Sequence, residues 1–160
     1  CSSLGRPRLV PGEKLASLDA SLHPRFGVTD FPLLEWDKEE NRWGAMNHPL
    51  TAPVDEDLAL LATDPGKVRA KAYDMVLNGS EIGGGSIRIH RKDVQSRMFD
   101  LLNIGPADAR VKFGFLLEAL EFAAPPPCGI AFGLARLALL VSGQKLLIAV
   151  IALPQHQRAP

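Results

Sequence analysis

A hairpin signal near the middle of the chain constrains the fold more than any other feature. Residues 72 to 90 read AYDMVLNGSEIGGGSIRIH, and Asn78-Gly79 is the strongest short signal for a two-residue β-turn, because both residue types tolerate positive φ. The residues on either side are therefore predicted to form two antiparallel strands. Three glycines, 83 to 85, fall in the second strand and leave no side chains to pack there. The sequence thus predicts a sheet with a bare stretch in one strand.

Counting outward from the turn places two carboxylates near each other. Asp74 lies opposite Gly83, so Asp74 and Glu81 are diagonal neighbours on one face, about 7 to 8 Å apart. Two carboxylates at that spacing can bridge a hard cation such as Mg²⁺, and open space is expected above Gly83. Arg88 would point to the other face under strict alternation, so we predict a β-bulge among the glycines that brings it to the side of Glu81. A solvated hairpin with ordinary surface charges is an equally good interpretation.

The segments around this hairpin alternate between strand-like and helix-like patterns. Before it, residues 13–22 suit a short helix, 26–36 read as a strand that Pro32 confines to an edge or a bend, and 42–50 read as its return strand. Trp36 and Trp43 would flank the charged turn between these two strands. A turn follows at Asp64-Pro65-Gly66, after a short helix that starts in the acidic run at 55–57.

Two helices and a strand–helix pair are predicted after the hairpin. The first helix has Val94, Met98, Leu101 and Leu102 at helical spacing and stops at Gly105-Pro106. The second covers 107–123, with Phe115, Leu116 and Leu120 as its core stripe. A strand at 128–133 then opens into an apolar helix at 134–143. Strands that precede helices in this order indicate an α+β domain built on an antiparallel sheet.

Composition limits the classes of protein to which the chain can belong. With 160 residues and 46% hydrophobic residues, it is long enough for one globular unit with a core. Its formal net charge is zero, so no global field favours nucleic acid, although a local basic patch stays open. Cys1 and Cys128 show neither metal spacing nor a disulfide framework, which favours a reducing compartment, with Cys128 buried or half-buried. The apolar stretches are too short or too charged to cross a membrane, and the start at Cys1 suggests a piece of a longer protein.

Five segments together resemble a known family: DFPLLEW, AMNHPLTAP, AYDMVLNGSEIGGGSIRIH, KFGFLLEAL and GIAFGLARLALL. In this order they are similar to the C-terminal half of the catalytic domain of bacterial-type aspartyl-tRNA synthetases, from about Leu4 to Pro154. The resemblance implies a class II synthetase core, an antiparallel sheet flanked by helices. It assigns 1–26 to the tail end of the bacterial insertion domain and 27–160 to the catalytic domain. The implied reaction activates aspartate with ATP and Mg²⁺ to aspartyl-adenylate and charges tRNA, in a homodimeric enzyme of the cytoplasm or an organellar matrix.

The resemblance also implies a role for individual residues. Asp74 and Glu81 would hold Mg²⁺ and the ATP phosphates, and Arg136 would contact the γ-phosphate side of ATP. Arg88 would pair with the side-chain carboxylate of aspartate in a bidentate contact that lysine could not copy. The rest of the implied ATP site is Gly133, Leu134 and Ala135, and the rest of the implied aspartate pocket is Asn47, His48, Gly84, Gly85 and Ser86.

Departures from the family pattern support an alternative function. Asn47 stands where the family has a histidine, Ala135 stands where it has an acid, and PPPCG replaces an expected PPHGG. The anticodon-binding barrel and the first two class II signatures do not occur in these 160 residues, and the second signature supplies the arginine that neutralises the α-phosphate. The chain alone is therefore expected to be inactive, and the alternative is a truncated paralogue with a structural or interaction role.

Overall fold

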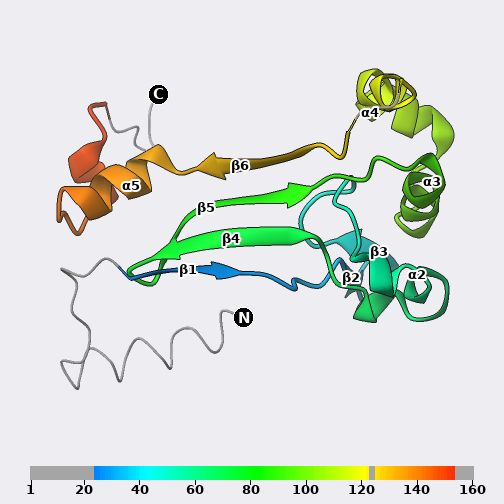
Figure 1. Ribbon diagram of the computed structural model, residues 1–160, viewed down its shortest axis with the longest axis horizontal. Helices are drawn as coiled ribbons and strands as arrows, with labels where there is room; N and C mark the ends of the chain where they lie inside the picture. The colour runs from blue at the N-terminus through cyan, green and yellow to red at the C-terminus, as the bar shows by residue number, and fades with distance from the viewer. Residues whose placement is uncertain (1–23, 123–124, 154–160) are drawn as a thin grey trace. The chain divides into compact units, whose positions relative to one another are not determined.

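The main sheet confirms the α+β class predicted from the sequence. The computed structural model describes residues 24–122 and 125–153, so the helix expected at 13–22 lies outside the described residues. The sheet has the strand order β1-β4-β5-β6 (Figure 1). Its strands are β1 (Arg25–Val28), β4 (Ala72–Leu77), β5 (Ser80–Ile87) and β6 (Cys128–Phe132). β1 runs antiparallel to β4, with Val28 opposite Asp74.

The chain divides into two compact units. The unit that contains the β4–β5 turn, called the hairpin unit here, comprises Cys1–Val28, Asp74–Gly84 and Ala131–Pro160. The second, called the core unit, comprises Thr29–Tyr73 and Gly85–Ile130. The boundary falls within β4, β5 and β6, so each of these strands contributes residues to both units.

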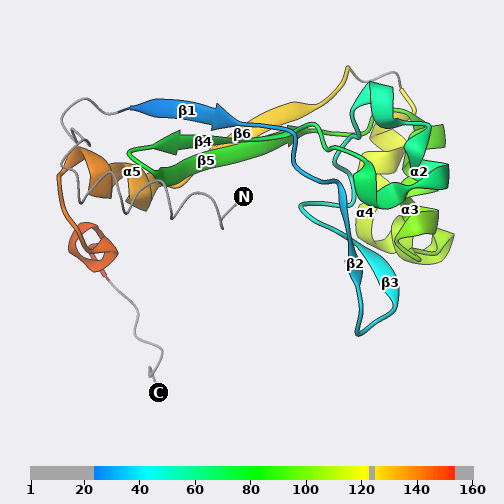
Figure 2. The same cartoon turned by 90° about the horizontal axis from the view of Figure 1, so that it is seen from below.

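The core unit contains a second sheet and most of the helices (Figure 2). Strands β2 (Leu34–Asp37) and β3 (Arg42–Ala45) form the predicted hairpin, and Trp36 pairs with Trp43 at a ring-centroid distance of 5.2 Å. The helical segments are the 3-10 turns η2 (Asp55–Asp57) and η3 (Pro65–Lys67) and the helices α2 (Leu60–Thr63), α3 (Lys92–Leu101) and α4 (Pro106–Leu120). Buried Asp57 accepts three hydrogen bonds from Arg69, which fixes η2 against the chain that leads into β4.

The hydrophobic core confirms the predicted stripe of α3 and corrects that of α4. Val94, Met98 and Leu102 are buried, and Leu101 packs against the same cluster. On α4, however, Phe115 is 90% exposed, and the side chains that pack inward are Ala109, Phe113, Leu116 and Leu117. Two residues along a helix turn the chain by about 200°, so Phe113 and Phe115 cannot share one face.

The hairpin unit is built around the predicted turn. Asn78 and Gly79 have φ values of 49° and 78°, as a two-residue turn with positive φ at both positions requires. After β6 the chain continues into α5 (Leu134–Val141) and η4 (Leu147–Val150). The N–H of Gly133 donates to the carbonyl of Ile82 at 2.8 Å, which ties the start of α5 to β5. Large apolar side chains stay exposed in this unit, among them Phe132, Leu134, Val141, Leu146 and Leu153.

Three further expectations differ from the structure. The strand expected at 26–36 is broken between β1 and β2, where Asp30 has a φ of 59° and Pro32 forms only an isolated bridge with Arg69. Pro106 does not end a helix but begins α4, because proline at the first helical position loses no internal hydrogen bond. Cys128 is exposed rather than buried.

Among the described residues, no helix has both the length and the apolar character that a membrane crossing needs.

Candidate functional site

The glycines of β5 accommodate strand β6. A Cβ added to Gly83 would lie 2.7 Å from the carbonyl oxygen of Ala131 and from a ring carbon of Phe132. A Cβ added to Gly85 would lie 1.9 Å from the carbonyl oxygen of Gly129. The open space expected above Gly83 is therefore filled in the direction of a side chain. Close approach of a neighbouring backbone, which only glycine permits, explains both positions.

One hydrogen bond supports the predicted bulge in β5. A uniform register counted from the turn would put Ile87 opposite Ala70. The N–H of Ile87 instead donates to the carbonyl of Lys71 at 2.9 Å. One extra residue in β5 produces such a shift, and glycine favours bulges. That Glu81 and Arg88 share one face stays a prediction.

The hairpin unit brings together two carboxylates and an arginine. Asp74 lies on β4, Glu81 on β5 and Arg136 on α5. Burial, and after it the negative charge of Glu81, raises the pKa of Asp74. Nη1 of Arg136 donates to the backbone carbonyl of Glu81 at 2.9 Å and lies 3.8 Å from its carboxylate. Glu81 and Arg136 line a pocket of about 320 Å³ with Ser80, Leu139, Leu140 and Leu147, and Asp74 lies outside its wall.

The carboxylate pair fits a cation that also binds a second ligand. Among the residues that the structure describes, no group of three or more His, Cys, Asp or Glu side chains could hold a metal ion. Burial raises the pKa of Asp74 and the charge of Glu81 adds to the rise, and a divalent cation beside both carboxylates would offset that second, repulsive contribution. Mg²⁺ commonly uses one or two carboxylates and takes its other oxygens from water and substrate phosphates. The donor set therefore suits phosphate-bound Mg²⁺ rather than a closed protein site.

The rest of the segment expected to bind ATP lies at the start of α5. Gly133 is its N-cap, and Leu134, Ala135 and Arg136 form its first turn. A Cβ on Gly133 would make ordinary contacts of 3.5 Å or more with the side chain of Arg136. Steric contact within the described residues therefore does not explain this glycine. The sequence pattern places Arg136 one helical turn from the end of β6.

Arg88 belongs to the core unit and is half-buried. Arg88 forms an isolated bridge with Thr51, and its N–H donates to the carbonyl of Pro127 at 2.8 Å. Its Nη1 is buried and has no hydrogen-bond partner among the described residues. A buried cationic donor without a partner is unfavourable, so its position indicates a site for an anionic acceptor.

Thr51 and Ser86 complete this part of the core unit. Both side chains are buried, and the hydroxyl of Thr51 donates to that of Ser86 at 3.5 Å. Thr51 was not among the residues expected from the sequence. Its position three residues after His48, within AMNHPLTAP, was the signal that could have identified it. The adjacent Gly84 and Gly85 lie on opposite sides of the boundary between the two units.

His48 is half-buried and Asn47 is exposed. Nδ1 of His48 accepts a hydrogen bond from the N–H of Leu50 at 3.1 Å, and its ring lies edge-on to Phe113 at 6.1 Å. Burial, and after it the positive charge of Arg88, lowers the pKa of His48. The lowered pKa favours the neutral imidazole at pH 7.

The chain is similar in sequence to several aspartate–tRNA ligases over nearly its whole length. It is 55% identical over 156 residues to an aspartate–tRNA(Asp/Asn) ligase of Geotalea uraniireducens, and 56% identical over 157 residues to one of Syntrophotalea carbinolica. An aspartate–tRNA ligase of Ruminiclostridium cellulolyticum is 52% identical over 157 residues. These alignments cover 98% of this chain but 26% of each relative, so the chain spans about a quarter of their length.

Solved structures and a family model agree on the fold. A putative aspartyl-tRNA synthetase from Leishmania major superposes with a TM-score of 0.61 at 20% identity, over 84% of this chain and 22% of that one. An asparaginyl-tRNA synthetase from Pyrococcus horikoshii superposes with a TM-score of 0.61 at 18% identity, over 89% of this chain and 30% of that one. The model for class II tRNA synthetases (D, K and N) matches residues 15–157. The chain therefore belongs to the family of class II tRNA synthetases for aspartate, lysine and asparagine.

Proposed function

We propose that this chain is the C-terminal catalytic segment of an aspartate–tRNA ligase. Its strongest support is the identity of about half of all residues with relatives of that name. The complete enzyme would activate aspartate with ATP to aspartyl-adenylate and transfer the aspartyl group to tRNA, as a homodimer in the cytoplasm. Because the chain covers a quarter of those relatives, it contributes part of that machinery.

Arg88 is the residue proposed to select aspartate. Its Nη1, which has no partner in the part of the chain that the structure describes, is ready to donate to the substrate's side-chain carboxylate, and a guanidinium can make two parallel hydrogen bonds to such a group. Asparagine presents an amide that offers only one acceptor oxygen and carries no charge, so it gains less from this site. Ser86 and His48 would border the amino acid without adding a second positive charge, since the pKa of His48 is lowered.

The hairpin unit is proposed to bind the phosphates of ATP. Arg136 is positioned by its hydrogen bond to the backbone of Glu81, which leaves the rest of its guanidinium for a phosphate oxygen. Asp74 and Glu81 would hold Mg²⁺. The ion would neutralise phosphate charge when bound. Gly133, Leu134 and Ala135 would face the nucleotide from the start of α5.

The test of the aspartate site is a calorimetric titration of the chain with L-aspartate. Arg88→Ala should weaken aspartate binding at least about tenfold, because a buried charged hydrogen bond is lost. Arg97→Ala is the matched control, since Arg97 is an exposed arginine of α3 and should leave binding unchanged. Equal affinity for aspartate and asparagine, or unchanged binding in Arg88→Ala, would contradict the proposal.

The alternative of a structural or interaction protein has one structural observation in its favour, besides the departures from the family pattern. The exposed apolar side chains of the hairpin unit offer a surface that another protein segment could cover. Titration with Mg-ATP separates the two functions. The ligase segment should bind it, and Arg136→Ala should weaken that binding. Failure to bind both Mg-ATP and aspartate would favour the interaction role.

A further inference from the structure

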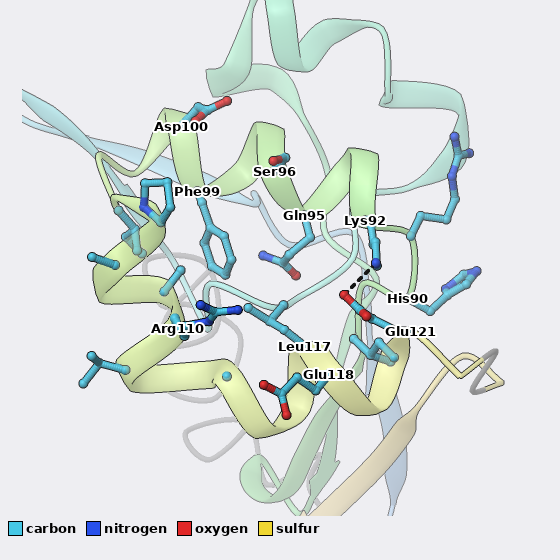
Figure 3. A pocket seen from close by; sticks show the side chains of 18 residues that line it. His90, Lys92, Gln95, Ser96, Phe99, Asp100, Arg110, Leu117, Glu118 and Glu121 are labelled. Carbon is cyan, nitrogen blue, oxygen red and sulfur yellow. Dashed lines mark hydrogen bonds and ion pairs between the residues drawn. The ribbon is translucent and has the colours of Figure 1, made fainter.

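The core unit contains a pocket whose wall includes no residue assigned to the proposed aspartate or ATP site. It lies between α3 and α4, has a volume of about 750 Å³ and is shown in Figure 3. This volume is within the range of about 300 to 1,000 Å³ typical of small-molecule sites. Neither Arg88 nor Ser86 belongs to its wall. The pocket is therefore separate from the proposed aspartate site.

A buried amide gives the pocket its polar feature. Gln95 is 4% exposed, and in Figure 3 its amide points between the two helices. Its Nε2 donates to the carbonyl of Pro49 at 3.3 Å, which identifies the other atom of the amide as the acceptor. That acceptor, Oε1, is buried and has no hydrogen-bond partner among the described residues. A buried acceptor of this kind favours a ligand that carries an N–H or O–H donor.

The walls around Gln95 are apolar and partly aromatic. Phe99 stacks on Phe113 with centroids 5.9 Å apart and an interplanar angle of 11°, which fixes its ring at the pocket. Ile104 and Leu117 extend the apolar surface. A flat, apolar ring system would fill such walls better than a flexible polar chain, because it gives up little conformational entropy on binding.

The charges at the rim balance. Among the described residues, three cationic and three anionic side chains line the pocket, and Lys92 pairs with Glu121 at 2.7 Å (Figure 3). The cationic residues are Arg91, Lys92 and Arg110, and the anionic residues are Asp100, Glu118 and Glu121. A balanced rim gives no net attraction for either sign of charge. It favours an uncharged ligand over a carboxylate or an amine.

We propose that the pocket between α3 and α4 binds a small, uncharged, planar heteroaromatic molecule whose ring N–H donates to Oε1 of Gln95. Phe99 and Leu117 contact its ring. This site is independent of the proposed ligase function, because no residue of its wall was assigned to aspartate, ATP or Mg²⁺. It would give the core unit a ligand that is not a substrate of the reaction.

Two matched probes test the donor directly. Indole and benzothiophene are bicyclic rings of similar size, but only indole has an N–H. In nuclear magnetic resonance titrations of the full chain, indole should shift the side-chain amide signals of Gln95 and bind at least about fivefold more tightly than benzothiophene. Absence of indole binding, or equal affinity for both rings, would overturn the proposal.

Two glutamine variants complete the experiment. Gln95→Leu should abolish the preference for indole while benzothiophene still binds, which also reports that the pocket is folded. Gln144→Leu changes an exposed glutamine and should keep the preference. A preference for indole that survives in Gln95→Leu would refute the assigned acceptor. If this variant does not fold, magnetisation transfer between the indole N–H and the Gln95 amide of the unmodified chain decides the same point, and its absence would count against the proposal.

Discussion

Replacing Gly85 with alanine should destabilise the core unit much more than the matched replacement of Gly129. The new Cβ at position 85 would lie 1.9 Å from the carbonyl oxygen of Gly129 and 3.0 Å from Cε2 of Tyr73, whereas a Cβ on Gly129 would have no atom of the described residues within 4 Å. To restore even a tight contact of 3.0 Å, β5 and β6 would have to separate by about 1.1 Å. The obstacle is a backbone atom, so a change of side-chain rotamer cannot relieve the clash.

The size of the effect follows from two contributions. Overpacking of this kind costs about 1 to 3 kcal/mol. The carbonyl oxygen of Gly129 also accepts a hydrogen bond from the hydroxyl of Tyr73 at 2.9 Å, and its loss adds about 0.5 to 1.5 kcal/mol. The entropic gain from removing a glycine stabilises both variants alike and cancels in the comparison. Gly85→Ala should therefore be about 2 to 4 kcal/mol less stable than Gly129→Ala, or about 4 to 16 °C lower in Tm.

Urea denaturation followed by far-ultraviolet circular dichroism measures this difference. A double-mutant cycle with Tyr73→Phe shows whether the hydroxyl bond is lost through the same displacement. Tyr73→Phe should destabilise the unmodified chain but have little further effect in Gly85→Ala. The reasoning would be refuted by a Gly85→Ala variant within about 0.5 kcal/mol of Gly129→Ala, since β6 would then not pack against β5 at this glycine.

Two other predictions concern His48 and the helix faces. Because the pKa of His48 is lowered in the fold, the neutral side chain contributes its full stability above the unfolded value of 6.5, and this stability is lost as the pH falls below 6.5. Titration of the His48 signals by proton nuclear magnetic resonance should place the midpoint below 6.5. Arg88→Ala should raise this midpoint without restoring 6.5, because burial is the larger cause of the shift. Met98→Ala should lower the free energy of unfolding by about 2 to 5 kcal/mol, whereas Phe115→Ser should change it by less than about 0.5 kcal/mol. Comparable losses in the two variants, measured by urea denaturation, would contradict the assignment of Phe115 to the exposed face of α4.

Local sequence patterns predicted the hairpins because their causes are local. Asn78-Gly79 determines its turn through backbone conformation alone, and the segment from Trp36 to Trp43 forms a short paired hairpin. The stripe of α3 was predicted for a similar reason: Val94, Met98 and Leu102 lie on one face of one helix. Helix α4 is different, since it has apolar residues on two faces. The sequence does not state which face its neighbours cover, so Phe115 was misassigned.

The candidate site was predictable only in part. Asp74 and Glu81 follow from counting along a hairpin, which uses no distant contact. The close approach of β6 to Gly83 and Gly85 involves residues more than 40 positions away along the chain, and no local pattern reports it. Thr51 and Gln95 were missed because their importance depends on burial beside other segments. Arg88 was identified by resemblance, while only the structure shows that its Nη1 is buried without a hydrogen-bond partner among residues 24–122 and 125–153.

The paired indoles of the β2–β3 hairpin determine what optical spectroscopy can see in this protein. Trp36 and Trp43 are the chain's two tryptophans, and both belong to the core unit. At 5.2 Å and an interplanar angle of 73°, their transitions should couple and give a paired exciton band in circular dichroism. Tryptophan emission would then follow the opening of one small hairpin. Events confined to β1, α5 or the end of β6 would pass unrecorded unless a third fluorophore were placed there.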